Sequence, residues 1–150
     1  MKKYILPQDN IAEETVVALG DFDGVHKAHK KLLEKTVEIA KEYNLASAVY
    51  MFDKSSKTSK RITPLNVKEV LICNQQVNLL VMQEVNQEFF DTTCEMFVEN
   101  TLKNKLNAKV VVVGQNYTFG KGGKGTSDLL SKLCKEQGIE CIIIDDVIHE

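Results

Sequence analysis

The sequence predicts an α/β fold, a three-layer sandwich in which a five-stranded parallel sheet carries helices on both faces. Five short runs of the chain are continuously apolar and rich in β-branched residues, which is typical of strands covered on both faces. Segments with helical periodicity alternate with these runs, and such alternation favours a parallel sheet with right-handed crossovers. The five predicted strands are Thr15–Leu19, Ala46–Phe52, Val77–Met82, Lys109–Val113 and Ile139–Ile144.

The first two helices are predicted from their ends. The first begins near Val25 or His26 and stops at Asn44, with charged residues on its outer face. The second begins at Thr63-Pro64, because a threonine N-cap followed by proline suits the first helical turn. The apolar face of the first helix is predicted to contain Leu32, Leu33, Thr36, Ile39, Ala40 and Tyr43.

The third and fourth helices are predicted from apolar stripes. The fourth begins with Ser127 as its N-cap and ends at Gly138, a residue type that suits the turn after a helix. Its inward face is predicted to contain Leu129, Leu130, Leu133 and Cys134. The stripe of the third helix consists of Phe89, Phe90, Thr93, Met96 and Phe97.

Length and composition narrow the class of protein. A chain of 150 residues without a repeat or a linker is expected to form one domain, residues 1–150. The net charge of −2 favours neither nucleic-acid nor membrane binding. No run is apolar and long enough for a signal peptide or a membrane span. The cysteines, which form no C-x-x-C pair, are interpreted as reduced thiols of a cytoplasmic protein. They are Cys73, Cys94, Cys134 and Cys141.

Three polar loops interrupt this pattern, and each follows a predicted strand. They have the sequences GDFDGVHKAH (20–29), KSSKTSKR (54–61) and GQNYTFGKGGKG (114–125). The carboxyl ends of parallel strands share one edge of the sheet, and open Rossmann-like sheets bind their ligands at that edge. The three loops are therefore expected to meet at one ligand-binding rim.

The first loop has the residues of a phosphate site. Gly20 and Gly24 allow a sharp turn close to a ligand, and the following helix directs its N–H groups and positive dipole end at the rim. His26 and His29 lie three residues apart and share one face of the first turn, so both can contact one phosphate. Two alternatives remain open. The histidines are ordinary surface residues, or they share a zinc ion, which needs a third ligand that His149 at the chain end does not offer.

The motif GDFDGVHKAHKKLL resembles the H-x-G-H signature of the nucleotidyltransferase superfamily. More closely, it resembles the adenylyltransferase module of bacterial bifunctional riboflavin kinase/FAD synthetase. The segments AVYMFDKS, RITPLNVKEVLI and KVVVVGQNYTFGKGGKG resemble later motifs of that family and occur in the family's order. The likeness thus extends over nearly the whole chain.

The resemblance implies an FMN adenylyltransferase, which transfers AMP from ATP, with Mg²⁺, to FMN and releases FAD and pyrophosphate. ATP and FMN are then the partners, with no nucleic acid, no membrane and no protein-held metal. By resemblance His26 and His29 are the catalytic residues at the ATP phosphates. The implied ATP-binding turn consists of Gly20, Asp21, Phe22, Asp23 and Gly24. The implied flavin-binding residues are Asp53, Asn116, Tyr117 and Phe119. For the two aromatic residues, packing of the loop onto the core remains an alternative.

The chain departs from the family pattern in four places. Ala28 and Gly123 stand where the family has glycine and arginine, and Met51 and Lys54 replace a threonine and a proline. The sequence also ends at Glu150, before the family's Ser/Thr/Arg phosphate segment and its riboflavin kinase module. These departures leave two alternatives beside the active enzyme: a catalytically impaired flavin- or nucleotide-binding module, or another nucleotidyltransferase such as a cytidylyltransferase. The oligomeric state is left open.

Overall fold

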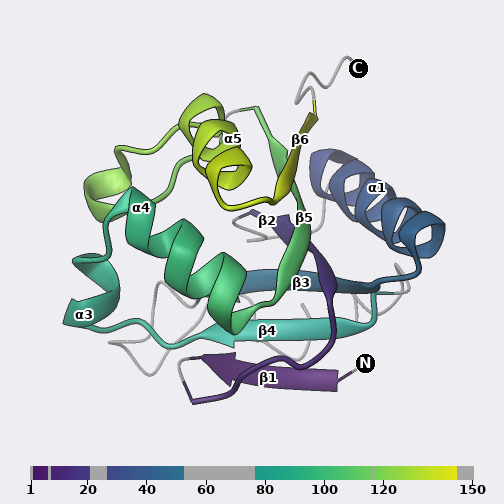
Figure 1. Ribbon diagram of the computed structural model, residues 1–150, viewed down its shortest axis with the longest axis horizontal. Coiled ribbons are helices and arrows are strands. Elements are labelled where there is room, and N and C mark those ends of the chain that lie inside the picture. The colour runs from purple at the N-terminus through teal and green to yellow at the C-terminus, as the bar shows by residue number, and fades with distance from the viewer. Residues whose placement is uncertain (1, 7, 21–26, 53–76, 116, 145–150) are drawn as a thin grey trace.

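The computed structural model describes residues 2–6, 8–20, 27–52, 77–115 and 117–144. In this part of the chain six strands form one fully parallel sheet in the order β1-β4-β3-β2-β5-β6 (Figure 1). The strands are β1 (Lys2–Leu6), β2 (Thr15–Leu19), β3 (Ala46–Phe52), β4 (Leu79–Gln83), β5 (Ala108–Gly114) and β6 (Glu140–Ile144). The predicted α/β class and parallel sheet are confirmed, but the sheet has six strands instead of five.

The sixth strand is β1, which is not predicted from the sequence because this strand lies at an edge of the sheet. Among the described residues it pairs with β4 alone, from Lys2 opposite Leu79 to Leu6 opposite Gln83. An edge strand does not need to be apolar on both faces, and in β1 only Leu6 is buried. The continuous apolarity that marks the other strands is therefore missing here.

Strand β2 lies in the middle of the sheet, between β3 and β5. All five of its side chains are buried, which explains its unbroken apolar sequence. The predicted bounds of β2 and β3 are confirmed, and those of the other three strands shift by one or two residues. Val77 and Ile139, which were expected inside strands, are buried residues just before β4 and β6.

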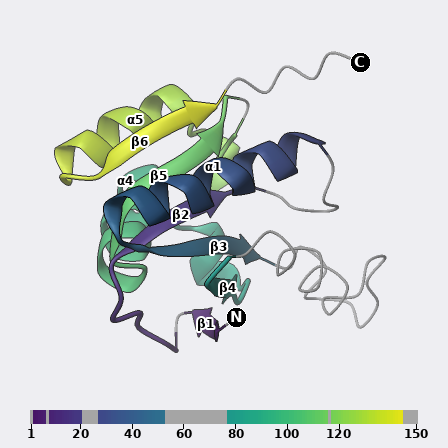
Figure 2. The same ribbon diagram turned by 90° about the vertical axis from the view of Figure 1, so that its right-hand side faces the viewer.

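Helices cover both faces of the sheet (Figures 1 and 2). Helix α1 (Lys27–Tyr43) packs on one face, over β2, β3 and β5. The opposite face is covered by α5 (Ser127–Glu136) and by the π-helical stretch η1 (Phe97–Lys105). Each face therefore has its own apolar cluster. The α1 side includes Leu32, Leu33, Val37, Ala40, Val16, Ala18, Val49 and Val112. The other side includes Phe97, Leu102, Leu130, Cys134, Val17, Leu19, Val111 and Phe119.

The predicted third helix is wrong as a single element. Two short helices, α3 (Gln87–Phe90) and α4 (Cys94–Met96), are separated by three residues. The break arises because Asn86 and Thr93 each act as an N-cap. The Asn86 side chain accepts a hydrogen bond from the Phe89 N–H, and that of Thr93 accepts one from the Met96 N–H.

The apolar stripe predicted for this region is also mostly wrong. Phe90 and Met96 are 44% and 48% exposed, so neither is a core residue. Helix α4 continues without interruption into η1, and it is η1 that buries its residues against the sheet. The buried residues there are Phe97, Val98 and Leu102.

Helices α1 and α5 end close to the predicted residues, but two other predictions for these helices are wrong. Asn44 after α1 and Gly138 after α5 have φ of +59° and +75°, the left-handed conformation expected after a helix. Tyr43, however, is 43% exposed and does not belong to the buried face of α1. The N-cap of α5 is Thr126, which accepts from the Leu129 N–H at 3.2 Å, whereas Ser127 is buried in the first turn.

Loss of this cap gives a testable expectation. Thr126→Ala should lower the free energy of unfolding by about 1 kcal/mol, the usual cost of removing a threonine N-cap. Urea denaturation followed by circular dichroism measures this loss. Lys132→Ala, an exposed change within α5, is the control and should shift stability by less than about 0.5 kcal/mol. Equal stabilities for the two variants would contradict the assignment of Thr126 as the cap.

The described residues test some of the remaining predictions and not others. The helix predicted after Thr63-Pro64 and the thiol of Cys73 lie outside them. Within them, Cys94, Cys134 and Cys141 are free thiols, as expected. No helix in the same ranges combines the length and the apolarity needed to cross a bilayer.

Candidate functional site

The sheet order places a topological switch point between β2 and β5. From β2 the chain adds β3 and then β4 on one side, and it later returns to add β5 and β6 on the other. Leu19 of β2 pairs with Val113 of β5, so the loops that follow these strands begin side by side. A crevice outside the carboxyl ends of strands at such a point is the usual ligand site of open α/β sheets.

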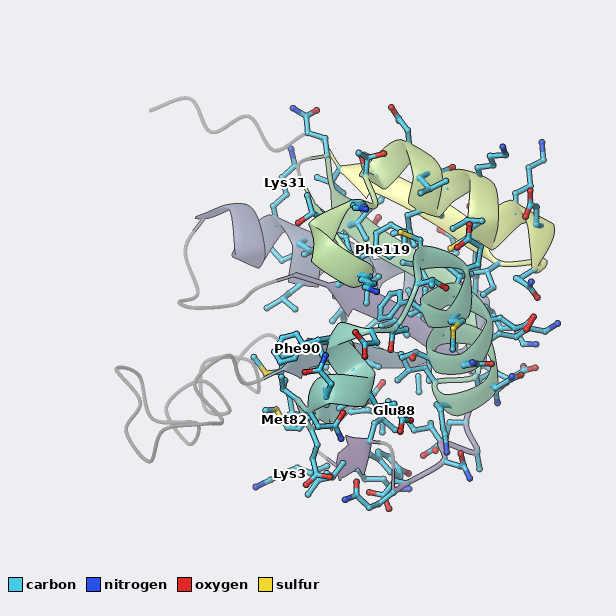
Figure 3. All side chains as sticks on the ribbon, turned by 90° about the vertical axis from the view of Figure 1, so that its left-hand side faces the viewer. Lys3, Lys31, Met82, Glu88, Phe90 and Phe119 are labelled. Carbon is cyan, nitrogen blue, oxygen red and sulfur yellow. The ribbon has the colours of Figure 1, made fainter. Side chains whose placement is uncertain are left out.

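Helix α1 directs its N-terminal end at this edge. In Figure 2 the first turns of α1 lie on the side toward which the arrowheads of β3 and β6 point. The helix is held there by Leu32 and Leu33, which are 5% and 0% exposed in the cluster beneath it. A helix N-terminus at the carboxyl edge favours an anion such as phosphate. The side chain of Lys31, labelled in Figure 3, is exposed near this end and adds positive charge.

Most of the predicted nucleotide site lies outside the described residues. This holds for Asp21, Phe22, Asp23, Gly24 and His26. Gly20 is described, and it follows β2 directly at the switch point. His29 lies in the first described turn of α1, and the structure does not describe its side chain. The structure therefore places the two ends of the motif at the expected edge, while the roles of its residues stay predictions.

The loop after β5 contains the segment Tyr117–Gly125, which we call the glycine loop. Within it Phe119 and Gly125 exchange two backbone hydrogen bonds, of 3.2 and 2.8 Å, which close residues 119–125 into a tight turn. A third bond, from the Gly123 N–H to the Gly120 carbonyl, closes the tip. Lys121 and Lys124 lie at this tip and are both exposed, so the loop presents two cations to solvent.

Two glycines of this loop are in positions that exclude a side chain. A Cβ on Gly125 would lie 2.5 Å from the ring of Phe119. A Cβ on Gly120 would lie 2.5 Å from Cys94 Sγ, and Gly120 also has a φ of +79°, which favours glycine. The loop therefore folds tightly against its own aromatic residue and against α4.

Phe119 attaches the glycine loop to the core. It is 6% exposed, and its ring centroid lies 5.5 Å from that of Phe97 and 6.2 Å from that of Tyr117. Figure 3 shows it between the loop and the helix formed by α4 and η1. This is the packing role that the sequence leaves open beside flavin binding. Tyr117 is half-buried and stacks parallel to Phe119, while Asp53 and Asn116 lie outside the described residues.

Tyr50 lies beneath these rings. Its own ring meets Phe97 edge-on at 5.7 Å, and its hydroxyl donates to Gln83 Oε1 at 3.0 Å. Burial, and secondarily the nearby Tyr117, raises the pKa of Tyr50 well above its ordinary value. Tyr50 is therefore a neutral, fixed support of the rim.

Helix α5 provides another attachment for the loop after β5. Ser127 Oγ donates to the Gln115 carbonyl at 2.8 Å, across the buried start of α5. Ser127 thus does not cap the helix but fixes the chain where it leaves β5.

A groove between α4, η1 and α5 is a poor alternative site for phosphate. It is lined by Glu95, Glu99 and Glu136 together with Met96 and Leu133. Three carboxylates repel an anion, whereas the switch-point edge combines a helix N-terminus with exposed lysines. Within the described ranges, no three histidine, cysteine, aspartate or glutamate side chains are grouped so that they could hold a metal ion.

Comparison with known families identifies the chain's relatives. A model of the FAD synthetase family matches residues 8–150, which is nearly the whole sequence. The chain belongs to the FAD synthetase family. The match includes all three polar loops as well as the sheet from β2 onward.

Curated members of the FAD synthetase family are similar at modest identity. A FAD synthetase of Listeria monocytogenes is 35% identical over 131 residues, which cover 83% of this chain and 53% of that protein. A bifunctional riboflavin kinase/FMN adenylyltransferase of Buchnera aphidicola is 26% identical over 147 residues, covering 93% and 47%. The corresponding Escherichia coli protein is 29% identical over 135 residues, covering 85% and 43%. The chain spans about half the length of these relatives.

Solved structures agree with this family fold. A Streptococcus pneumoniae structure titled as a macrolide-efflux protein has a TM-score of 0.81 and 25% identity, covering 97% of this chain and 50% of that one. A universal stress protein in complex with cAMP has a TM-score of 0.54 at 14% identity, covering 91% and 100%, and shares the fold alone. The parallel sheet with helices on both faces is thus common to both.

Some residues that support this edge of the FAD synthetase-family chain are not evident from sequence. Cys94, Ser127 and Tyr50 all support the rim, yet they come from three different elements. The sequence pattern places Ser127 at a helix cap, and Cys94 and Tyr50 sit within ordinary helix and strand patterns. Only the tertiary packing brings them beside the loop after β5.

Proposed function

We propose that this chain is an FMN adenylyltransferase that transfers AMP from ATP to FMN and releases FAD and pyrophosphate. The observation that carries the proposal is the pairing of β2 with β5, which brings two motifs of a FAD synthetase-family chain to one edge. One motif leads into the N-terminus of α1, and the other forms the glycine loop. An anion-binding helix end next to a loop with aromatic residues and lysines suits a phosphorylated flavin and a nucleotide.

The proposed adenylyl transfer requires few catalytic groups from the protein. A phosphate oxygen of FMN attacks the α-phosphorus of ATP, a new P–O–P bond forms, and the bond to the β-phosphate oxygen breaks to release pyrophosphate. The nucleophile is already an anion, so no strong general base is needed. The work of the chain is to align the two phosphates and to stabilise the charge that builds on pyrophosphate.

Each group of residues has a proposed part in this work. His26 and His29 donate to the phosphates of ATP, beside the N–H groups of α1. The turn from Gly20 to Gly24 surrounds the nucleotide, and the lysines of the glycine loop attract the negative substrates. Asp53, Asn116, Tyr117 and Phe119 form the flavin side, with Phe119 acting from within the core.

Magnesium enters this proposal with the nucleotide, as MgATP. Mg²⁺ commonly keeps several waters and binds through substrate phosphates rather than through a protein cage. The described residues offer no cluster of three metal-binding side chains. The steps assigned to this chain are therefore binding, alignment and charge stabilisation.

The direct test is a product assay. The purified chain is incubated with α-labelled ATP, Mg²⁺ and FMN, and FAD and pyrophosphate are separated by chromatography. We expect FAD to form with ATP and FMN and not with riboflavin, because riboflavin lacks the attacking phosphate. A chain that forms no FAD under any divalent cation would overturn the proposal.

A second candidate is a flavin- or nucleotide-binding module without turnover. Gly123 favours it, since the family pattern has arginine there and glycine offers no guanidinium to a phosphate. Its φ of +65° suits glycine. Calorimetric titration with MgATP and then FMN distinguishes the two, because the module binds both and yields no FAD. Labelled CTP with a phosphoalcohol acceptor, in a parallel reaction, tests the cytidylyltransferase alternative.

A further inference from the structure

The starting observation is a contact between α4 and the glycine loop. Cys94 Sγ donates to the Phe119 carbonyl at 3.8 Å, a long hydrogen bond that is ordinary for sulfur. The backbone of Gly120 lies so close to Cys94 that an added Cβ would be 2.5 Å from its Sγ and 3.1 Å from its nitrogen. The loop therefore rests directly on the first residue of α4.

The position of Cys94 is itself fixed. Thr93 caps α4 by accepting from the Met96 N–H at 3.1 Å, which sets the direction in which the first turn projects. On the other side, Phe97 in the same continuous helix contacts the Phe119 ring. One helix thus holds both the side chain and the carbonyl of Phe119.

The thiol is suited to a structural donor. Burial, and secondarily the charge of Glu95, raises the pKa of Cys94 above its ordinary value, so the proton stays on sulfur at neutral pH. A neutral thiol can donate to the carbonyl. Cys94 is also small enough to leave room for the backbone of Gly120 beside it.

We propose that Cys94 is a positioning residue: its contact with Phe119 and Gly120 keeps the glycine loop in place and thereby sets the affinity of the site for FMN. The second half of this proposal rests on the proposed function, and the first half does not. The loop contains Tyr117 on its flavin side and exposes Lys121 and Lys124 at its tip. Release of the loop from α4 should therefore weaken FMN binding more than ATP binding.

The loop itself offers a readout that needs no substrate. Trypsin cleaves after lysine, and native chains are cut only where the backbone opens locally. Initial rates of cleavage after Lys121 and Lys124, followed by mass spectrometry, therefore report how often the loop leaves α4. We expect Cys94→Ala to raise these rates roughly two- to five-fold, because alanine removes the weak S–H donor together with the contact between its sulfur and Gly120. Cys94→Ser, which keeps a donor, should recover part of the difference.

The matched control is Cys141→Ala. Cys141 is a half-buried thiol on β6 and has no part in the proposed site. This variant tests whether the loss of any half-buried thiol raises the cleavage rate in the glycine loop. We expect its cleavage rates at Lys121 and Lys124 to equal those of the unmodified protein.

A double-mutant cycle tests the contact with Gly120. Gly120→Ala adds a methyl group that meets Cys94 Sγ, so it should also open the loop. In the Cys94→Ala background the methyl group meets a smaller side chain, and the added effect should be smaller. Strictly additive effects would show that Cys94 and Gly120 do not act on each other.

The effect of Cys94 on FMN binding is tested by comparing KM for FMN with KM for ATP. We expect Cys94→Ala to raise KM for FMN, and the Kd from flavin fluorescence, about five-fold, with KM for ATP unchanged. Equal changes for both substrates would overturn this half. Equal cleavage rates in Cys94→Ala and Cys141→Ala would overturn the positioning role, whatever the activity. If the unmodified chain makes no FAD, the proposed function fails. The tryptic cleavage rates then still test the positioning role of Cys94, and the Kd for FMN from flavin fluorescence still tests its effect on flavin binding.

Discussion

Replacement of His29 by alanine is expected to lower the rate of FAD formation by roughly two to three orders of magnitude, the usual cost of removing one donor from a developing anion. His29 lies in the first described turn of α1, and that end of the helix is at the switch-point edge. In the proposed reaction pyrophosphate gains charge as it leaves, and the imidazole N–H of His29 is expected to stabilise that charge. Steady-state kinetics with MgATP and FMN measure the effect as kcat/KM.

The control for this variant is Lys35→Ala. Lys35 is on the exposed side of α1, where it forms an ion pair with Glu38 at 3.1 Å. Exposed pairs of this kind contribute little to stability, so the control should keep both its fold and its activity. Circular dichroism checks that His29→Ala is folded. A folded His29→Ala variant within a few-fold of the unmodified rate would remove the histidine from the mechanism.

Phe119→Ala is expected to lower the free energy of unfolding by about 3–5 kcal/mol, the range for deleting a buried aromatic ring. The ring contacts Phe97 and Tyr117, and Gly125 packs against its edge. Alanine leaves a cavity between the glycine loop and the helix, and the loop loses its attachment to the core. Urea denaturation monitored by circular dichroism gives the difference directly.

Phe90→Ala is the matched control, since Phe90 is 44% exposed on α3. A surface phenylalanine should cost no more than about 1 kcal/mol. Similar losses for the two phenylalanines would show that Phe119 is not the anchor of the loop. Phe119→Leu should fall between the two, because it refills part of the cavity.

The middle of the sheet is predictable from sequence for a physical reason. Strands β2 and β3 are covered on both faces, so their apolar runs are unbroken and their ends are sharp. An edge strand such as β1 lacks this signal. Its charged residues, Lys2 and Lys3, are exposed, and only pairing with β4 shows that the segment is a strand.

The prediction of the third helix failed for a different reason. The phenylalanine and methionine spacing around Phe90 and Met96 fits a helix, and the caps at Asn86 and Thr93 override it. Short polar side chains that bind nearby N–H groups stop one helix and start the next. Because the apolar residues here are largely exposed, their spacing contributes little burial energy to oppose the caps.

The candidate site is predictable at the level of motifs and not at the level of contacts. Glycines and histidines after β2, and glycines and aromatics after β5, are enough to predict that these two loops leave the same edge of the sheet, and the pairing of β2 with β5 confirms this. That a ligand binds between them stays a prediction. The contact of Cys94 with the glycine loop cannot be predicted in this way, because Cys94 and Phe119 are 25 residues apart in sequence. Local hydrophobic periodicity does not predict a tertiary contact of this kind.

Strand β2 gains its second neighbour only after β5 has been made. Thr15 Oγ1 donates to the Leu106 carbonyl at 2.8 Å, a buried bond between residues 91 positions apart. During synthesis, the nascent chain therefore holds β2 with one open flank until the segment around Ala108 leaves the ribosome. Contacts this distant in sequence fold slowly and leave strand edges available for aggregation. The edge at the carboxyl ends of β2 and β5 is thus among the last parts of the molecule to assemble, and a ligand held between the loops that follow these strands can bind only after the two strands have paired.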